Sequence, residues 1–419
     1  MKLLRQGIYL IIFCLPLYLV RFEIFSIPTT VLELLIYILF ISWFITSLQS
    51  KKLQSTTYNL WIIPIFLILM GISLATIFSF DLRVSAGIWK TWFIDPVLFF
   101  IVLISVIKTN KQIKRIFYSL FLSGTIVSIV ALIYLILGKL DSLGRLQAFY
   151  DSPNYLAMYL APALIISAGY CLFTFLASSG EARSGTGPRS FAKNETNILF
   201  SLTTSKKAIA SAFILLSTAC LLLAIVFTKS FGVWLGIIAA LGISLFIWLF
   251  KIKRKLAWII LFVAVIGIAI LGCFAIQHRA SSLGARLIIW EKAIQIYKNN
   301  PILGIGPGTF RNYFPPYPEW GVPHPHNIFL AFLLQTGIIG FIGFIWLIIL
   351  FFKTTIKKLF ACKDSEAWRM WSVASLMAIM IYFLVHGLVD TTYWKNDLSV
   401  MFWLVIGLVT ILKMQEYKK

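Results

Sequence analysis

Apolar runs of about 20 residues follow one another along almost the whole chain, and they constrain its fold more than any other feature. A helix of about 20 residues crosses the roughly 30 Å of hydrocarbon in a bilayer. Hydrophobic residues make up 60% of the 419 residues, against about 45–50% in a soluble domain. The sequence therefore predicts an all-α, polytopic membrane helical bundle. About twelve transmembrane helices are expected, at residues 6–22, 29–48, 58–78, 84–107, 113–137, 153–178, 208–228, 231–250, 256–276, 326–350, 370–389 and 396–412.

The basic residues are concentrated in every second loop between these runs. If the N-terminus is inside, 25 of the 37 Lys and Arg residues fall in inner segments, together with five of the 15 acidic residues. This excess follows the positive-inside rule, so both termini are predicted to be cytoplasmic. The same distribution explains the formal charge of +22, and no nucleic-acid partner is expected. The five cysteines form no CxxC pair, so neither a disulfide framework nor a zinc site is predicted.

One long outer loop divides the chain into two groups of helices. Residues 1–276 hold the first nine helices and a disordered cytoplasmic loop at 179–207, which is rich in Ser, Gly, Thr and Lys. Residues 277–325 form the long extracytoplasmic loop. Residues 326–419 hold the last three helices and a short cytoplasmic tail.

The long outer loop begins with the pattern of an amphipathic helix. Apolar residues recur at i, i+4, i+7, i+11 and i+14, while polar residues occupy the other side. This pattern predicts a helix that lies in the membrane interface and ends at Asn299 to Pro301. The apolar positions are Leu283, Leu287, Trp290, Ile294 and Tyr297.

The second half of this loop is rich in Gly, Pro and aromatic residues and carries two of the four histidines. Pro325 separates His324 from His326, and an apolar helix is predicted to begin near His326. Gly337 and Gly340 would then lie close to the face of His326, where they would let a neighbouring backbone or a lipid chain approach. An imidazole accepts a proton at neutral pH, so His326 is a candidate general base. The alternative is a helix-start residue bonded to backbone, and His324 has the weaker claim.

Several basic residues lie on the predicted outer side, where the positive-inside rule disfavours them. Arg286 begins the amphipathic helix, Arg145 follows the fifth run, and Lys229 lies between the seventh and eighth. The guanidinium group of an arginine binds two phosphate oxygens at once. These basic residues are therefore candidates for binding a phosphorylated headgroup. Each could instead reach lipid phosphates or cap a helix end.

A histidine inside an apolar run is a further functional signal. His386 lies in the eleventh run, where the structural alternative is a hydrogen bond between helices that involves Asp390, one turn on. The outer acidic residues are scattered, and the outer side has no DxD, EF-hand or HxxH pattern. No metal site is therefore predicted.

The histidine loop and the glycines after it resemble a known family. His326 and Asn327, followed after nine residues by Gly337 and then by Gly340, match the H[NSQ]-x9-GxxG pattern of the O-antigen ligase and O-antigen polymerase family of membrane glycosyltransferases. The resemblance covers nearly the whole chain, most specifically residues 284–340.

Further segments are similar to the same family. The segment from Arg286 to Trp290 resembles its R-x3-L segment, with Trp replacing Leu, and residues 152–157 and 300–306 also look like it. Relatives often carry Ser-Arg-Gly after the seventh helix, where this chain has Lys229. A lysine there keeps the positive charge but loses the planar fork of arginine.

The resemblance implies a GT-C-like helical fold and an inverting, metal-independent transfer with no cofactor. The donor would be a glycan on a polyprenyl (undecaprenyl) pyrophosphate carrier. The acceptor would be a hydroxyl of a glycan or glycolipid at the outer face of the bacterial cytoplasmic (inner) membrane. A polymerase of the same family is the alternative, and a lipid-linked glycan transporter is the alternative of another class. The oligomeric state is not predicted.

The resemblance also assigns roles to the candidate residues. His326 and Arg286 are the expected catalytic residues, and the loop 277–325 is the expected catalytic loop. The pyrophosphate is expected to contact Arg286, Arg145 and Lys229. Gly337 and Gly340 form the expected helix-packing groove. The possible supporting residues are His324, Asn327, Asn154, His386 and Asp390.

Overall fold

The structure is a computed structural model that describes residues 1–25, 27–49, 59–183, 204–278, 280–313, 324–361 and 367–415. This described part is almost entirely helical, which confirms the all-α class. A 3-10 helix (Leu15–Leu19) follows α1, and a π-helix (Trp89–Ile94) joins α4 to α5. The α-helices are α1 (Lys2–Phe13), α2 (Val31–Gln49), α3 (Asn59–Ile77), α4 (Leu82–Ile88), α5 (Asp95–Val106), α6 (Asn110–Ile136), α7 (Pro153–Arg183), α9 (Thr204–Phe227), α10 (Phe231–Ile252), α11 (Arg254–His278), α12 (Ala280–Asn299), α13 (Phe310–Tyr313), α14 (Ile328–Ala361), α15 (Ala367–His386) and α16 (Asn396–Met414).

Nine helices within the described residues are long and apolar enough to cross a membrane, which confirms a multi-pass membrane protein. They are α2, α3, the continuous stretch of α4 and α5, α6, α7, α9, α14, α15 and α16, and α10 has a shorter apolar stretch, Phe231–Ile247. The first predicted span, 6–22, differs. There α1 has 12 residues and ends before Pro16, which lacks the N–H that would continue it. Of the predicted disordered loop, residues 184–203 lie outside the described residues.

A short β-hairpin between α1 and α2 is a feature that the sequence analysis did not predict. Its strands are β1 (Arg21–Ile24) and β2 (Ile27–Thr30), which pair antiparallel. The N–H of Val31 donates to the carbonyl of Val20 at 3.1 Å, so the hairpin closes directly onto the start of α2. Strands of four residues are too short to show a clear alternating pattern in the sequence.

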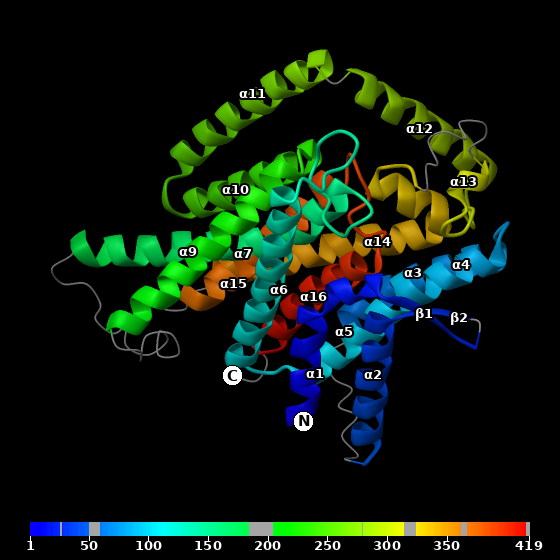
Figure 1. Ribbon diagram of the computed structural model, residues 1–419, viewed down its shortest axis with the longest axis horizontal. Coiled ribbons are helices and arrows are strands. Elements are labelled where there is room, and N and C mark those ends of the chain that lie inside the picture. Colours follow the sequence, from blue (N-terminus) through cyan, green and yellow to red (C-terminus); the bar gives the residue numbers. More distant parts are fainter. Residues whose placement is uncertain are drawn as a thin grey trace.

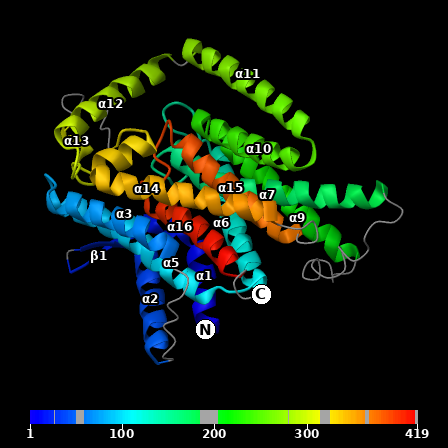
Figure 2. The ribbon, with the colours of Figure 1, turned by 180° about the vertical axis from the view of Figure 1, so that it is seen from behind.

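The longest helix, α14, runs lengthwise through the molecule beside α3, with α15 and α16 next to it (Figures 1 and 2). α10 packs along α15 and α5 packs along α16. α11 and α12 form an arch at one edge, and the loops that lead into α14 and α16 lie on the α12 side (Figure 1). The start of α1 and the end of α16 lie toward the opposite edge in both views. The chain thus separates its termini from the loop that carries the histidines.

α14 is interrupted at Gly337, whose φ of 64° and ψ of −175° only glycine adopts readily. The segment that follows α12 enters this break. The N–H of Ile338 donates to the carbonyl of Pro301 at 3.1 Å, and the N–H of Ile305 donates to the carbonyl of Leu334 at 2.9 Å. A Cβ atom at Gly337 would fall on a carbonyl oxygen of the inserted segment. The inserted segment therefore packs directly against the backbone of Gly337 and requires a glycine there.

Gly340 packs against α3 rather than lining an open slot. A Cβ atom on Gly71 of α3 would lie 2.6 Å from the Cα atom of Gly340, so two backbones approach closely here. The sequence allowed either a neighbouring backbone or a lipid chain to approach these glycines. In the structure the backbone of α3 lies against Gly340. The expected phasing with His326 is wrong, because α14 begins at Ile328 and His326 lies outside the helix. Gly337 and Gly340 thus shape the packing of α14.

We expect Gly337→Ala to destabilise the protein. The backbone conformation alone costs about 1–3 kcal/mol for a residue other than glycine, and the contact with the inserted segment adds to this. Thermal unfolding of the detergent-purified protein measures the effect. Gly242→Ala in α10 is the matched control, because a Cβ atom there meets nothing within 4 Å and alanine favours a helix. Equal unfolding temperatures for Gly337→Ala and the parent would contradict the role of the break.

Candidate active site

The loop before α14 runs beside the loop after α15, and hydrogen bonds join the two. The N–H of Ile328 donates to the carbonyl of Gly387 at 2.7 Å. The side-chain amide of Asn327 donates to the carbonyl of Leu388 at 3.0 Å. These bonds hold the histidine loop against residues that lie about 60 positions further along the chain. The geometry of the site is therefore set by this pairing.

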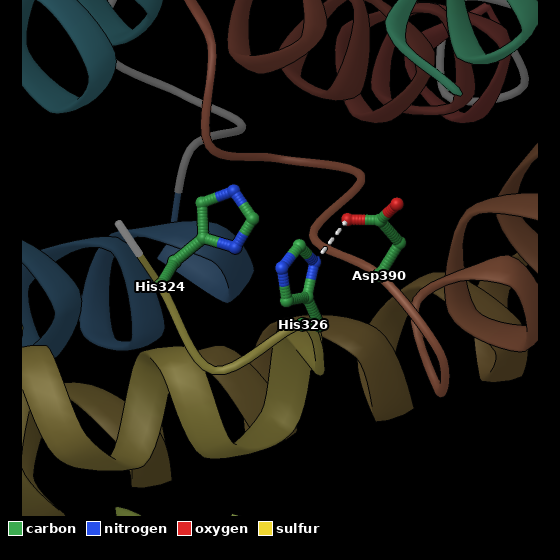
Figure 3. Close-up of side chains that lie close together, drawn as sticks. All are labelled: His324, His326 and Asp390. Atoms are coloured by element: carbon green, nitrogen blue, oxygen red, sulfur yellow. Dashed lines mark hydrogen bonds and ion pairs between the residues drawn. The ribbon is translucent and has the colours of Figure 1, made fainter. Parts of the chain in front are cut away.

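Asn327 also caps α14. Its side-chain oxygen accepts hydrogen bonds from the N–H groups of Phe329 at 2.9 Å and Leu330 at 3.0 Å, which have no partner within the helix. His326 precedes this cap and adopts a left-handed φ of 46°. This turn points the imidazole away from the helix and toward the loop after α15 (Figure 3). The second residue of the HN motif thus positions the first.

His326 and Asp390 form the central pair of the site. His326 Nδ1 lies 3.2 Å from Asp390 Oδ1 (Figure 3), and Asp390 is 3% exposed. Asp390 also accepts hydrogen bonds from the amide of Asn154 at 2.8 Å and from the N–H of Thr391 at 2.9 Å. Burial alone would raise the pKa of Asp390, but the hydrogen bond from His326 and the nearby imidazoles lower it below its ordinary value. The carboxylate is therefore ionised and turned toward the imidazole.

His324 lies beside this pair but in a different environment. Its ring is buried, with its centroid 4.6 Å from that of His326. The hydroxyl groups of Tyr155 and Thr391 both lie 3.1 Å from its Nε2. Burial lowers the pKa of His324 to about 3, so the ring is neutral at physiological pH. Of the two histidines, His326 has the more exposed side chain, 31% of which is accessible.

Arg286 and Trp290 attach α12 to the two loops. Arg286 Nε donates to the carbonyl of Val389 at 3.0 Å, next to Asp390. One turn on, the indole N–H of Trp290 donates to the carbonyl of Pro325 at 3.0 Å, between the two histidines. The predicted R-x3-L segment therefore contacts both sides of the His326–Asp390 pair. Tryptophan supplies a hydrogen bond there that leucine lacks.

The helix predicted at the start of the loop is confirmed as α12, which ends at Asn299. Its packing face overlaps the predicted one only in part, since Trp290 and Tyr297 of the predicted face pack against the buried cluster. Ile289, Ala293 and Ile296 are buried against the protein, whereas Leu287 is 61% exposed. The sequence offers apolar residues on two sides of this helix, and contact with α14 selects one of them.

Arg145 and Lys229 lie together next to Asn154. Arg145 donates from Nε to the carbonyl of Thr228 at 3.1 Å and from its terminal nitrogen to the side-chain oxygen of Asn154 at 2.9 Å. Because Asn154 in turn donates to Asp390, a continuous chain of hydrogen bonds links Arg145 to the central pair. Lys229 follows Thr228, is exposed, and adopts a left-handed φ of 50°. All three predicted cations thus lie around the histidine loop.

Residues 216–345 match the family model described as O-Antigen ligase. This segment is similar to the O-antigen ligase family. The match begins within α9 and includes Lys229, Arg286 and His326, and the family supports a ligase-like or polymerase-like enzyme that uses lipid-linked glycans. A search of curated proteins finds none that matches this chain.

Arg145, Asn154 and Asp390 of the site lie outside the matched O-antigen ligase segment. Asn154 and Asp390 come from the start of α7 and from the loop after α15. The hydrogen bonds described above join them to the matched residues. The site is therefore built from three separate parts of the chain.

Lys395 is a cation near the site that the sequence analysis did not single out. Its Nζ atom lies 2.6 Å from Asp151 Oδ2 and 4.0 Å above the ring of Tyr155, which bonds His324. Burial would raise the pKa of Asp151, but the hydrogen bond and the charge of Lys395 lower it. Its signal in the sequence is a basic residue on the predicted outer side, just before the last apolar run.

His386 has a different partner from the one considered above. Its Nδ1 lies 2.9 Å from the hydroxyl of Tyr382 on the same helix, while Asp390 pairs with His326. A Cβ atom on Gly232 of α10 would lie 2.6 Å from the His386 ring, so the ring packs directly against that helix. His386 therefore supports the packing of α10 on α15.

The site also contains a group of possible metal ligands that the sequence analysis did not anticipate. One ligand atom from each of His324, His326 and Asp390 lies within 4.8 Å of the others. The prediction of no metal site considered acidic residues on the outer side and placed Asp390 at the end of a helix. Its proximity to the two histidines results from the pairing of the loops.

Proposed function

We propose that this protein transfers a glycan from a polyprenyl (undecaprenyl) pyrophosphate carrier to an acceptor hydroxyl on the outer face of the bacterial inner membrane. The observation that carries the proposal is the half-exposed His326 held by a buried carboxylate, with Arg145, Arg286 and Lys229 around it. A base and a cluster of cations are the groups that glycan transfer from a pyrophosphate requires. The acceptor is a glycan or glycolipid.

His326 would act as the general base through Nε2. Because Asp390 is ionised and lies beside Nδ1, the Nδ1 atom carries the proton and Nε2 carries the lone pair. The acceptor hydroxyl gives its proton to Nε2 as its oxygen bonds to the anomeric carbon. The bond between that carbon and the pyrophosphate oxygen breaks, the electron pair leaves with the pyrophosphate, and the configuration inverts.

The cationic side chains would stabilise the leaving pyrophosphate. Arg286 is fixed beside the pair by Val389, and Arg145 is fixed through Asn154. Lys229 adds a third positive charge, with its Nζ atom 3.7 Å from the position of a Cβ atom on Gly144, next to Arg145. Because three side-chain cations are placed to receive the developing charge, we propose that the transfer step is metal-independent.

An assay with the purified protein and a lipid-linked glycan tests this function. We expect the glycan to appear on the acceptor and undecaprenyl pyrophosphate to be released in equal amounts. A transporter would instead move the lipid-linked glycan across a vesicle membrane without releasing pyrophosphate. Comparing a glycolipid acceptor with a second lipid-linked glycan separates a ligase from a polymerase, which is the alternative within the family.

We further propose that the loop 277–325 is the extracytoplasmic catalytic loop and that both termini are cytoplasmic. The positive-inside excess supports this orientation, as does the placement of α12 opposite the start of α1 and the end of α16 (Figure 1). Lys298→Cys on α12 and Lys357→Cys on α14 test it, because both side chains are exposed. In a background without the native cysteines, an impermeant reagent should label Lys298→Cys in intact cells and Lys357→Cys only after permeabilisation. The reverse pattern would contradict the orientation.

Arg286→Lys is expected to lower kcat/KM for the donor by about 10- to 100-fold, the value of one charge-assisted hydrogen bond. Lysine keeps the charge but loses the fork and the bond from Nε to Val389. Arg311→Lys on α13 is the matched control, since Arg311 is exposed in the same loop. If Arg286→Lys equals the parent at all donor concentrations, Arg286 only anchors α12.

A further inference from the structure

We propose that His324, His326 and Asp390 form a binding site for a zinc-type divalent metal ion, and that the bound ion blocks transfer. The proposed transfer step uses no metal, although it uses His326 of this site. The blocking effect rests on the proposed function, whereas metal binding does not. The ion would be an inhibitor that acts on the catalytic imidazole itself.

The arrangement of the three side chains is close to that of a tetrahedral site. Metal–ligand bonds of about 2.0–2.1 Å place two tetrahedral ligand atoms about 3.3 Å apart. The separation of His326 Nδ1 and Asp390 Oδ1 is 3.2 Å, which already fits. The ligand atoms of all three residues lie within 4.8 Å of one another, so His324 is the side chain that would shift to close the site. A tetrahedral ion has a fourth position, which water would fill.

The chemistry of these ligands selects the metal. Two imidazoles and one carboxylate suit Zn²⁺, Ni²⁺ or Cu²⁺, whereas Mg²⁺ and Ca²⁺ require six or more oxygen ligands. Asn154 bonds Oδ2 of the carboxylate and the N–H of Thr391 bonds Oδ1, and outer hydrogen bonds of this kind orient the ligands of metal sites. The positive charges of Arg145 and Arg286 further disfavour ions that bind only through charge.

A bound ion would change the tautomer of His326. The metal takes the lone pair of Nδ1, so the proton that Nδ1 carries moves through solvent to Nε2. An Nε2 atom that bears a proton cannot accept the proton of the acceptor hydroxyl. Occupancy of the site would therefore remove the general base. The accompanying displacement would be the shift of the His324 side chain that closes the site. This effect differs from competition with the donor for the cationic side chains.

Zinc binding to the tag-free, full-length protein tests the site. A cysteine-free background removes competing thiols, and a zinc indicator dye that competes for the ion reports the affinity. We expect one Zn²⁺ per chain, unaffected by a large excess of Mg²⁺. His324→Gln and Asp390→Asn should each weaken binding more than about tenfold, and Co²⁺ should give the visible absorption of a tetrahedral site. His278→Ala in α11 is the matched histidine control and should bind zinc as the parent does.

The outcomes separate the metal site from the proposed function. Zinc affinity that is equal in the parent, His324→Gln and Asp390→Asn would overturn the site and leave the function untouched. Zinc that binds through these residues, in a protein that transfers no glycan when metal-free, would overturn the function and leave the site. Transfer that continues at saturating zinc would overturn the blocking effect. Two results together support both parts of the proposal. In the parent, inhibition of transfer follows zinc occupancy. In His324→Gln, the zinc concentration that inhibits transfer, measured against that variant's own zinc-free rate, is more than about tenfold higher.

Discussion

His326→Ala is expected to lower the rate of glycan transfer by about 10²- to 10⁴-fold, which is the contribution of a positioned general base. The corresponding increase in the barrier is about 2.7–5.4 kcal/mol. Membrane insertion and donor binding should change little, because the ring is 31% exposed and the helix cap belongs to Asn327. The measurement is kcat per folded enzyme, with the amount of folded protein determined by size-exclusion chromatography.

A second substitution separates loss of the base from strain in the backbone. His326 has a φ of 46°, which alanine adopts poorly and asparagine tolerates well. His326→Asn should therefore fold as the parent does and be as inactive as His326→Ala. His324→Ala should retain more activity than either, because the buried ring of His324 faces Tyr155 and Thr391. If His324→Ala is the more damaging change, the base has been assigned to the wrong imidazole.

Asp390→Asn is expected to reduce transfer by a similar factor, about 10²- to 10⁴-fold, without a large loss of folded protein. The amide keeps the size of the side chain and, with its oxygen in the place of Oδ2, the hydrogen bond from Asn154, while its NH2 group takes the place of Oδ1 beside His326 and the N–H of Thr391. It cannot stabilise the imidazolium that forms at His326, and an amide N–H turned toward Nδ1 would favour the wrong tautomer. The loss should appear in kcat, with little change in the affinity for the donor.

Asp151→Asn provides the control for Asp390→Asn. Asp151 is also a carboxylate near the site, but its side chain is 58% exposed and pairs with Lys395. Removing its charge leaves the His326–Asp390 pair intact, so the loss of kcat should be much smaller. Equal losses for the two variants would show that Asp390 acts only through the general charge of the region.

The sequence alone determined the class of the protein and the outline of its helices. The apolar runs predicted 29–48 and 396–412, and the structure has α2 at Val31–Gln49 and α16 at Asn396–Met414. These predictions succeed because the membrane requirement acts on each segment separately. The end of α12 at Asn299 was also predicted, since Asn and Pro stop a helix through local backbone chemistry.

The candidate site was determined only in part by the sequence. His326, Arg286 and Gly337 could be identified because the spacing within one continuous segment carries the motif. The role of Gly337 was not visible, because its φ of 64° is required by a segment that enters α14 from residues about 35 positions earlier. A preference for glycine shows in the sequence, but the backbone that requires it does not.

Only the tertiary structure decided the partner of His326. Asp390 was placed near His386 by the spacing of one helical turn, yet its carboxylate bonds His326, which is 64 residues away. The structure likewise placed Arg145 and Asn154 beside Asp390. A helix fixes the neighbours of a residue three or four positions away, whereas contacts between loops depend on how α14 and α15 pack. Local periodicity therefore determined the spans, and long-range packing assembled the groups that would carry out the chemistry.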